Sequence, residues 1–156
     1  MQVPPNSDLT LGMVCVEKSV PGRCTWRMRA DERFANPAGT MQGGFLGAFA
    51  DSSMGAAAVT FAQGRKVFCA NAEMKISFLA PVPRDAILTC TAHVVSGGST
   101  VAFVEASIWA EGAEHGERDR SEAPEAGGGA DAGGGAGLEG RLVARANSTY
   151  IFRPRG

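Results

Sequence analysis

The sequence predicts an α+β fold in which an antiparallel sheet wraps around one long central helix. An apolar run from Phe45 to Phe61 follows Gly43-Gly44 and ends near Ala62, which is the length of a buried helix. Most of its side chains are glycine, alanine or serine, so a curved sheet can approach it closely on several sides. β-rich runs separated by turn residues occupy most of the remaining chain.

Two β-rich runs precede the helix and four follow it. Pro21-Gly22 marks a turn between the first two, and Ser96–Ser99 reads as a hairpin turn between two later ones. Short connections between consecutive strands favour antiparallel pairing. The expected strands are Leu11–Val20, Arg23–Ala30, Val67–Leu79, Asp85–Val95, Thr100–Ala110 and Arg141–Arg153.

The chain has 156 residues, enough for a single domain with its own core. Its composition changes between Gly112 and Gly140, a stretch rich in glycine, alanine and acidic residues with almost no large apolar side chain. Such a segment cannot bury enough surface to offset the entropy of ordering it. We therefore expect a disordered insertion at 112–140 within one domain.

Charge and cysteine usage exclude several classes of protein. The net charge of −1 gives no electrostatic footprint for nucleic acid. The four cysteines contain no CxxC pair and the chain has only two histidines, so no metal or other cofactor is expected. The first residues lack the basic and apolar regions of a signal peptide, and Asp51 argues against a membrane span over Phe45–Phe61. These features predict a cytoplasmic protein with no membrane partner.

Gly43-Gly44 stands where the helix is expected to begin. The first backbone N–H groups of a helix have no intrahelical partner, and the helix dipole adds partial positive charge there. Glycine leaves these donors open, so they can stabilise an oxyanion. The alternative is that the two glycines only provide a flexible entry to the helix.

Asp51 is the one charged residue in the apolar helix. Acidic side chains are seldom buried without a reason, and a carboxylate in such surroundings suits a general base or a nucleophile. The alternative is a structural carboxylate paired with an arginine such as Arg33 or Arg84.

The spacing of Gly44 and Asp51 constrains the mechanism. Seven residues are two helical turns, so both lie on one face, about 10 Å apart along the axis. One substrate carbonyl group can hardly touch both within a single subunit. A symmetric dimer with antiparallel helices would bring Asp51 of one chain near Gly44 of the other and create two shared sites.

The segment NPAGTMQGGFLGAFAD resembles the phenylacetic-acid-degradation (PaaI-like) thioesterases and related thioesterase superfamily proteins of the hot-dog fold. The matching positions are Asn36, Gly39, Gly43, Gly44 and Asp51, and the resemblance covers most of residues 25 to 152. It implies a hot-dog acyl-CoA thioesterase that assembles as a homodimer or homotetramer. In this family the Asp acts as base or nucleophile, and a glycine N–H at the helix start binds the thioester oxygen.

The resemblance also assigns neighbouring positions. Asn36 matches an Asn that the family uses near the thioester or its attacking water, although an Asn-Pro turn alone would also explain it. Asn71 falls where relatives place a small polar residue beside that water. The usual His before the glycine pair is Gln42 here, which can donate and accept at similar reach. We therefore expect Gln42, Gly43 and Asn71 to contact substrate.

Two other functions are alternatives to hydrolysis. A non-catalytic acyl-CoA binding or sensing protein would explain the replacement of His by Gln42. A hot-dog hydratase would require a catalytic His near the helix, and there is none between Ala30 and Ala92. Hydrolysis of an acyl-CoA with a medium-chain or aromatic acyl group is the function that the sequence favours.

Overall fold

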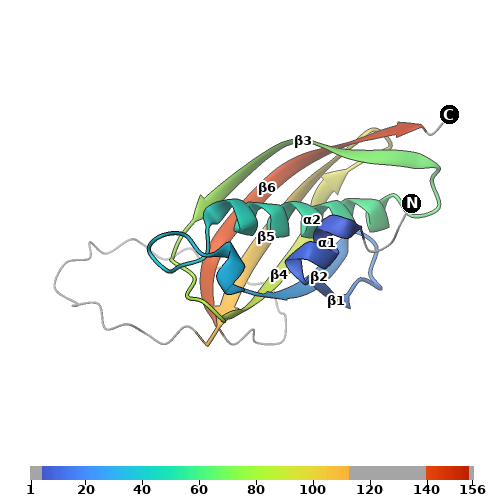
Figure 1. Ribbon diagram of the computed structural model, residues 1–156. Coiled ribbons are helices and arrows are strands. Elements are labelled where there is room, and N and C mark those ends of the chain that lie inside the picture. Colours follow the sequence, from blue (N-terminus) through green and yellow to red (C-terminus); the bar gives the residue numbers. More distant parts are fainter. Residues whose placement is uncertain (1–4, 113–139, 155–156) are drawn as a thin grey trace.

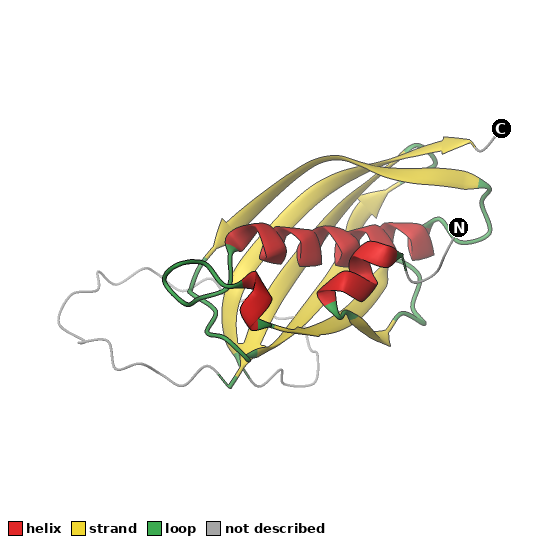
Figure 2. Ribbon diagram, in the orientation of Figure 1, coloured by secondary structure: helices red, strands yellow, loops and turns green. Residues whose placement is uncertain are grey.

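A computed structural model describes residues 5–112 and 140–154, and the insertion expected at 112–140 lies almost wholly outside them. Six antiparallel strands form one sheet in the order β1-β2-β4-β5-β6-β3, and helix α2 crosses one face of it (Figures 1 and 2). This is the hot-dog arrangement that the sequence predicts. The elements are α1 (Asn6–Leu11), β1 (Val14–Glu17), β2 (Arg23–Arg29), η1 (Glu32–Phe34), α2 (Gly43–Phe61), β3 (Val67–Phe78), β4 (Ile87–Gly97), β5 (Val101–Glu111) and β6 (Arg141–Pro154).

Helix α2 packs against β2, β3, β4, β5 and β6, so its small side chains do admit the sheet on several sides. Only one flank carries large core residues. Phe49 and Met54 are completely buried, and each such side chain contributes about 1.5–3 kcal/mol by leaving water. The opposite flank carries Gly44 and Ala48, which are exposed. The helix therefore has a core face and an open face.

The expected strands after Pro21 match observed strands to within a few residues, and the turns lie where they were predicted. Gly22 adopts a left-handed φ of 79°, and the Arg23 N–H donates to the Val20 carbonyl to close that turn. The expected strand at Leu11–Val20 is wrong at its start. Leu11 instead ends the short helix α1, because Gly12 caps it in the left-handed conformation, and only Val14–Glu17 pairs as β1.

Strand β3 forms one edge of the sheet and pairs only with β6 among the described residues. Its register shifts between Asn71 and Glu73, which leaves Ala72 as the extra residue of a β-bulge. Beyond the bulge, Met74 and Ile76 lie on the α2 side while Lys75 and Ser77 lie on the outer face. The bulge reverses this alternation, so Asn71 also lies on the α2 side. No helix in the described parts of the chain is long and apolar enough to cross a membrane.

Candidate active site around Asp51

Asp51 lies halfway along α2, on the side that faces β3 and β6. It is half-buried in the single chain, less than the full burial expected from its apolar neighbours. Its Oδ1 accepts a hydrogen bond of 2.6 Å from Asn71 Nδ2 and lies 2.7 Å from the Tyr150 hydroxyl. Oδ2 has no donor among the described residues, so one carboxylate oxygen is held and the other is free.

Asn71 reaches Asp51 because the bulge at Ala72 turns its side chain toward the helix. Its Oδ1 lies 2.7 Å from the Ser148 hydroxyl, which also lies 2.7 Å from the Glu73 carbonyl. An ionised carboxylate can only accept hydrogen bonds, so the NH2 end of the Asn71 side chain faces Asp51. The structure thus brings Asn71 and Asp51 together, and contact of Asn71 with substrate stays a prediction.

Tyr150 and Ser148, on β6, were not predicted as site residues. Both are buried, and Tyr150 pairs with Asn71 across the strands. Burial, with a further contribution from Asp51, raises the pKa of Tyr150 well above its usual value, so the hydroxyl remains a donor. A signal was present in the sequence. Inward positions of β6 are otherwise small or apolar, and a Ser and a Tyr two residues apart depart from that pattern.

The start of α2 has the free donors that an oxyanion hole requires. Gln42 is the N-cap residue but makes no side-chain capping bond, and the first turn begins with Phe45 N–H donating to the Gln42 carbonyl. The N–H groups of Gly43 and Gly44 therefore have no acceptor in the described chain. A Cβ at Gly44 would meet nothing within 4 Å, whereas one at Gly43 would lie 3.0 Å from the Phe78 ring.

An open groove of about 600 Å³ connects these donors to Asp51. Its walls are α2 and the inward side of β3. Apart from Gln42 and the Asp51 carboxylate its lining side chains are apolar or absent, which suits an acyl or pantetheine chain. The lining residues are Gln42, Gly43, Gly44, Gly47, Ala48, Asp51, Met74, Ile76 and Phe78.

Asn36 is not brought to Asp51. Its Oδ1 accepts from the N–H groups of Ala38 and Thr40, and its Nδ2 donates to the Thr40 hydroxyl at 3.0 Å. These bonds close the loop that leads to Gly43, with Gly39 at a left-handed φ of 77°. Within one chain Asn36 therefore acts as the turn residue that the alternative interpretation described.

Asp51 has no arginine partner in the described chain. Arg33 pairs instead with Asp31 at 2.8 Å, and that contact lowers the pKa of the Asp31 carboxyl. The structural role proposed as the alternative for Asp51 is therefore not realised through Arg33. The carboxylate is left with neutral donors on one oxygen only.

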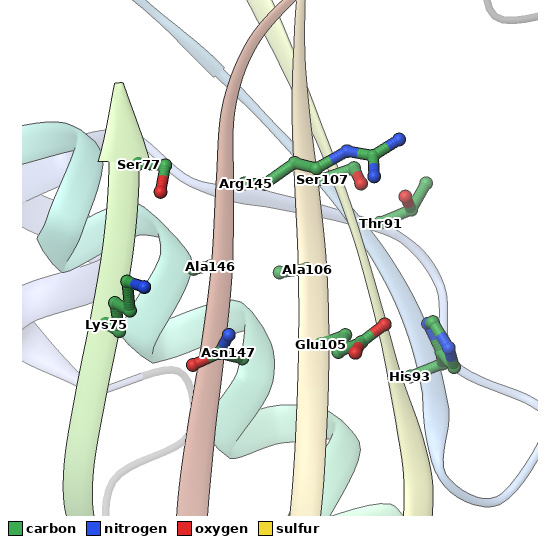
Figure 3. A pocket seen from close by; sticks show the side chains of 10 residues that line it. All are labelled: Lys75, Ser77, Thr91, His93, Glu105, Ala106, Ser107, Arg145, Ala146 and Asn147. Atoms are coloured by element: carbon green, nitrogen blue, oxygen red, sulfur yellow. The ribbon is translucent and has the colours of Figure 1, made fainter. Parts of the chain in front are cut away.

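A second pocket, of about 310 Å³, lies on the face of the sheet opposite α2 (Figure 3). Its polar side chains come from four neighbouring strands, with Asn147 placed between Lys75 and Glu105 in the cross-strand register. His93 pairs with Glu105 across the strands and is exposed. None of the predicted site residues reaches this face.

The cysteines behave as core residues. Burial raises the pKa of Cys24 to about 11 and that of Cys90 to about 12, so both thiols remain protonated near neutral pH. All four cysteines are free. In residues 5–112 and 140–154 no three metal-binding side chains come together.

The site thus combines a carboxylate with one hydrogen-bonded oxygen, open helix N–H groups and an apolar groove on a hot-dog fold. Comparison with known proteins places the chain in a superfamily. The Thioesterase superfamily model matches residues 38–116, and the chain belongs to this superfamily. Human acyl-coenzyme A thioesterase 13 is 25% identical over 103 residues, which cover 66% of this chain and 72% of the relative.

Solved structures share the fold over nearly the whole chain. The Escherichia coli PaaI protein of the phenylacetic acid degradation operon matches with a TM-score of 0.72 at 16% sequence identity. The match covers 95% of this chain and 84% of the PaaI chain. A Streptococcus pneumoniae thioesterase solved with coenzyme A has a TM-score of 0.71 at 16% identity, covering 96% and 94%. At 16% sequence identity, the similarity to these two structures shows a shared fold and nothing more specific.

Proposed function

We propose that this protein hydrolyses acyl-CoA thioesters to a free acid and CoA. The observation that carries the proposal is Asp51, whose Oδ1 is held by Asn71 and Tyr150 while its Oδ2 is free beside an apolar groove. Its relative acyl-coenzyme A thioesterase 13 and a similar fold solved with coenzyme A support this substrate class.

In the general-base form of the mechanism, Asp51 takes a proton from a water molecule whose oxygen attacks the thioester carbonyl carbon. The resulting oxyanion accepts a hydrogen bond from the Gly44 N–H at the positive end of α2. Collapse of the intermediate breaks the C–S bond, and the CoA thiolate leaves and is protonated. In the nucleophilic form, Asp51 itself attacks and water cleaves the resulting anhydride.

Single turnover in oxygen-18 water, with limiting substrate, tests for the nucleophilic form. If water cleaves the anhydride at the Asp51 carboxyl carbon, Asp51 gains oxygen-18 and the acid leaves with an unlabelled oxygen from Asp51. General-base catalysis labels the acid and leaves the protein unlabelled. Oxygen-18 in Asp51 would therefore establish direct attack.

We further propose that the site is shared between two copies of the chain. Strand β3 has 12 residues, and no other described strand pairs with its outer edge; Phe68 and Phe78 near its two ends are about half exposed. An edge of this length is a template for pairing with a second chain. Antiparallel pairing about a twofold axis would lay the two α2 helices antiparallel and set Gly44 of one near Asp51 of the other.

A thiol-release assay with acetyl-, octanoyl-, palmitoyl- and phenylacetyl-CoA tests the activity. We expect turnover of at least one substrate, and a loss of several orders of magnitude for Asp51→Asn with the fold and CoA affinity preserved. Full activity of Asp51→Asn would overturn the mechanism. Binding of the panel with no thiol release would instead support the acyl-CoA sensor.

Complementation tests the shared site. Asp51→Asn and Gly44→Pro each remove one half of every site, but a mixed dimer retains one site with an intact Asp51 and an intact Gly44. Random mixing after unfolding and refolding should restore about a quarter of the wild-type activity, since half of the dimers are mixed and each has one good site. No restoration would place both groups in one subunit.

A further inference from the structure

We propose that Tyr150 is a positioning residue for Asp51, which fixes Oδ1 so that Oδ2 is the oxygen that takes the proton or attacks. This inference rests on the proposed hydrolysis and adds a residue to it that the sequence motif does not contain. Three features of the described chain carry it: the place of Tyr150 on β6, its contacts with the helix, and the shared acceptor with Asn71.

Tyr150 reaches Asp51 from almost 100 residues further along the chain. Its hydroxyl lies 2.7 Å from Asp51 Oδ1 and 2.9 Å from the Asp51 carbonyl oxygen, and its ring is buried. The ring packs beside Gly55, one turn after Asp51, where even an added Cβ would lie at an ordinary contact distance of 3.6 Å. Packing therefore holds the Tyr150 ring in place independently of its hydrogen bond to the carboxylate.

The two contacts give the single hydroxyl proton two possible acceptors. While Asp51 is ionised, the carboxylate is the stronger acceptor and the shorter contact. Once Asp51 has accepted a proton, the hydroxyl can turn to the backbone carbonyl of the same residue without losing its hydrogen bond. Tyr150 therefore has a hydrogen-bond acceptor on residue 51 whether or not that carboxyl carries a proton.

Asn71 on β3 and Tyr150 on the neighbouring strand β6 both donate to Oδ1 of Asp51. With both donors on Oδ1, the carboxylate cannot rotate freely to exchange its two oxygens. Oδ2 keeps its lone pairs for water or substrate. This is the arrangement expected of a base that must be oriented as well as ionised.

Two titratable side chains of the described chain are close enough to interact with the Asp51 charge, Tyr150 on β6 and Cys69 on β3. Burial raises the pKa of Cys69 to about 11, and the pKa of Tyr150 is raised further still. Neither group changes charge between pH 4 and 9. A change in the acid limb of the pH–rate profile in this range therefore does not come from ionisation of Tyr150 or Cys69.

The first test is Tyr150→Phe in the full-length protein, assayed with the acyl-CoA that wild type turns over best. We expect kcat to fall about tenfold or more, KM to change less than about twofold, and the acid limb of kcat to move to higher pH, because the ionised carboxylate loses a donor. Ser53→Ala is the matched control. It removes a buried hydroxyl from the core face of α2, where Ser53 donates to the Phe49 carbonyl, and should not move the pH profile.

The second test does not depend on turnover. Tyr150 is the only tyrosine in the chain, so biosynthetic incorporation of 3-fluorotyrosine labels this position alone. We expect its fluorine resonance to titrate with the midpoint of the acid limb in wild type, and to show no titration in Asp51→Asn.

The outcomes separate this inference from the proposed function. If wild type releases no thiol from any acyl-CoA, the hydrolytic function fails, whatever the fluorine resonance shows. If wild type is active and Asp51→Asn is not, but Tyr150→Phe retains full kcat with an unshifted acid limb, the positioning role is wrong. A fluorine resonance that does not respond to Asp51 would overturn it as well.

Discussion

The two faces of α2 are built from different kinds of residue. The core face buries Phe49 and Met54 completely against the sheet. The open face presents Gly44, Ala48 and Asp51 to a groove that β3 borders. One face supplies stability through buried volume, and the other leaves donors and a carboxylate accessible at the cost of helix propensity. Substitutions on the two faces should therefore affect different measurements.

The largest effect on stability is expected on the core face. Phe49→Ala removes a fully buried ring and leaves a cavity, which should lower the free energy of unfolding by about 3–5 kcal/mol. Urea denaturation followed by circular dichroism measures it. Val59→Ala is the control, because Val59 lies on the same helix but is 57% exposed and should cost less than about 0.5 kcal/mol. Equal losses for the two variants would contradict the division into faces.

Gly44→Pro should raise the activation free energy of the reaction by about as much as Phe49→Ala lowers the free energy of unfolding. It should leave the free energy of unfolding nearly unchanged. Proline is tolerated in the first turn of a helix but has no N–H, so the proposed oxyanion donor is lost. We expect kcat to fall by about 100- to 1,000-fold. Gly44→Ala keeps the N–H, and its Cβ would meet no atom within 4 Å in the chain. If both variants lose activity equally, the N–H is not the group that matters.

The contrast between the faces was partly predictable. A helix that is apolar or small almost everywhere, with one carboxylate and a glycine pair at its start, predicts both the wrapped fold and the candidate Asp51. Turn residues then predict most strand boundaries. The start of β1 was missed because a helix of only six residues before Gly12 carries too little periodicity to be distinguished from a strand.

The partners of Asp51 were harder to predict for a geometric reason. Alternation along β3 would place Asn71 and Met74 on opposite faces, and only the bulge at Ala72 brings them to the same side. The resemblance to thioesterases, and not the strand pattern, indicated Asn71. Tyr150 reaches the site because β6 lies between β5 and β3, an order that no local pattern specifies.

Ser52, the residue after Asp51, allows a test with a smaller expected effect on stability. Its hydroxyl donates to Asp8 Oδ1 at 2.8 Å and so ties α1 to α2, while Asp8 is 5% exposed. Ser52→Ala should cost about 1–2 kcal/mol, because the buried carboxylate loses a donor, and leave kcat unchanged. Thr10→Ala is the control, since it removes an exposed hydroxyl from α1. A large loss of kcat would show that Asp51 and Ser52 act as one unit.

The smallest effect is expected at Gly55, which is part of α2 and lies next to the Tyr150 ring. Alanine in place of glycine within a helix gains about 0.5–1 kcal/mol, since the unfolded chain loses freedom. Its Cβ would lie 3.6 Å from the Tyr150 ring, an ordinary contact, so neither the ring nor its bond to Asp51 should move. We therefore expect Gly55→Ala to raise the unfolding free energy slightly at unchanged kcat, measured by urea denaturation and the thiol assay. A loss of stability instead would mean that the space beside Gly55 is occupied in the assembled protein, and the open face would then be a packed interface between subunits.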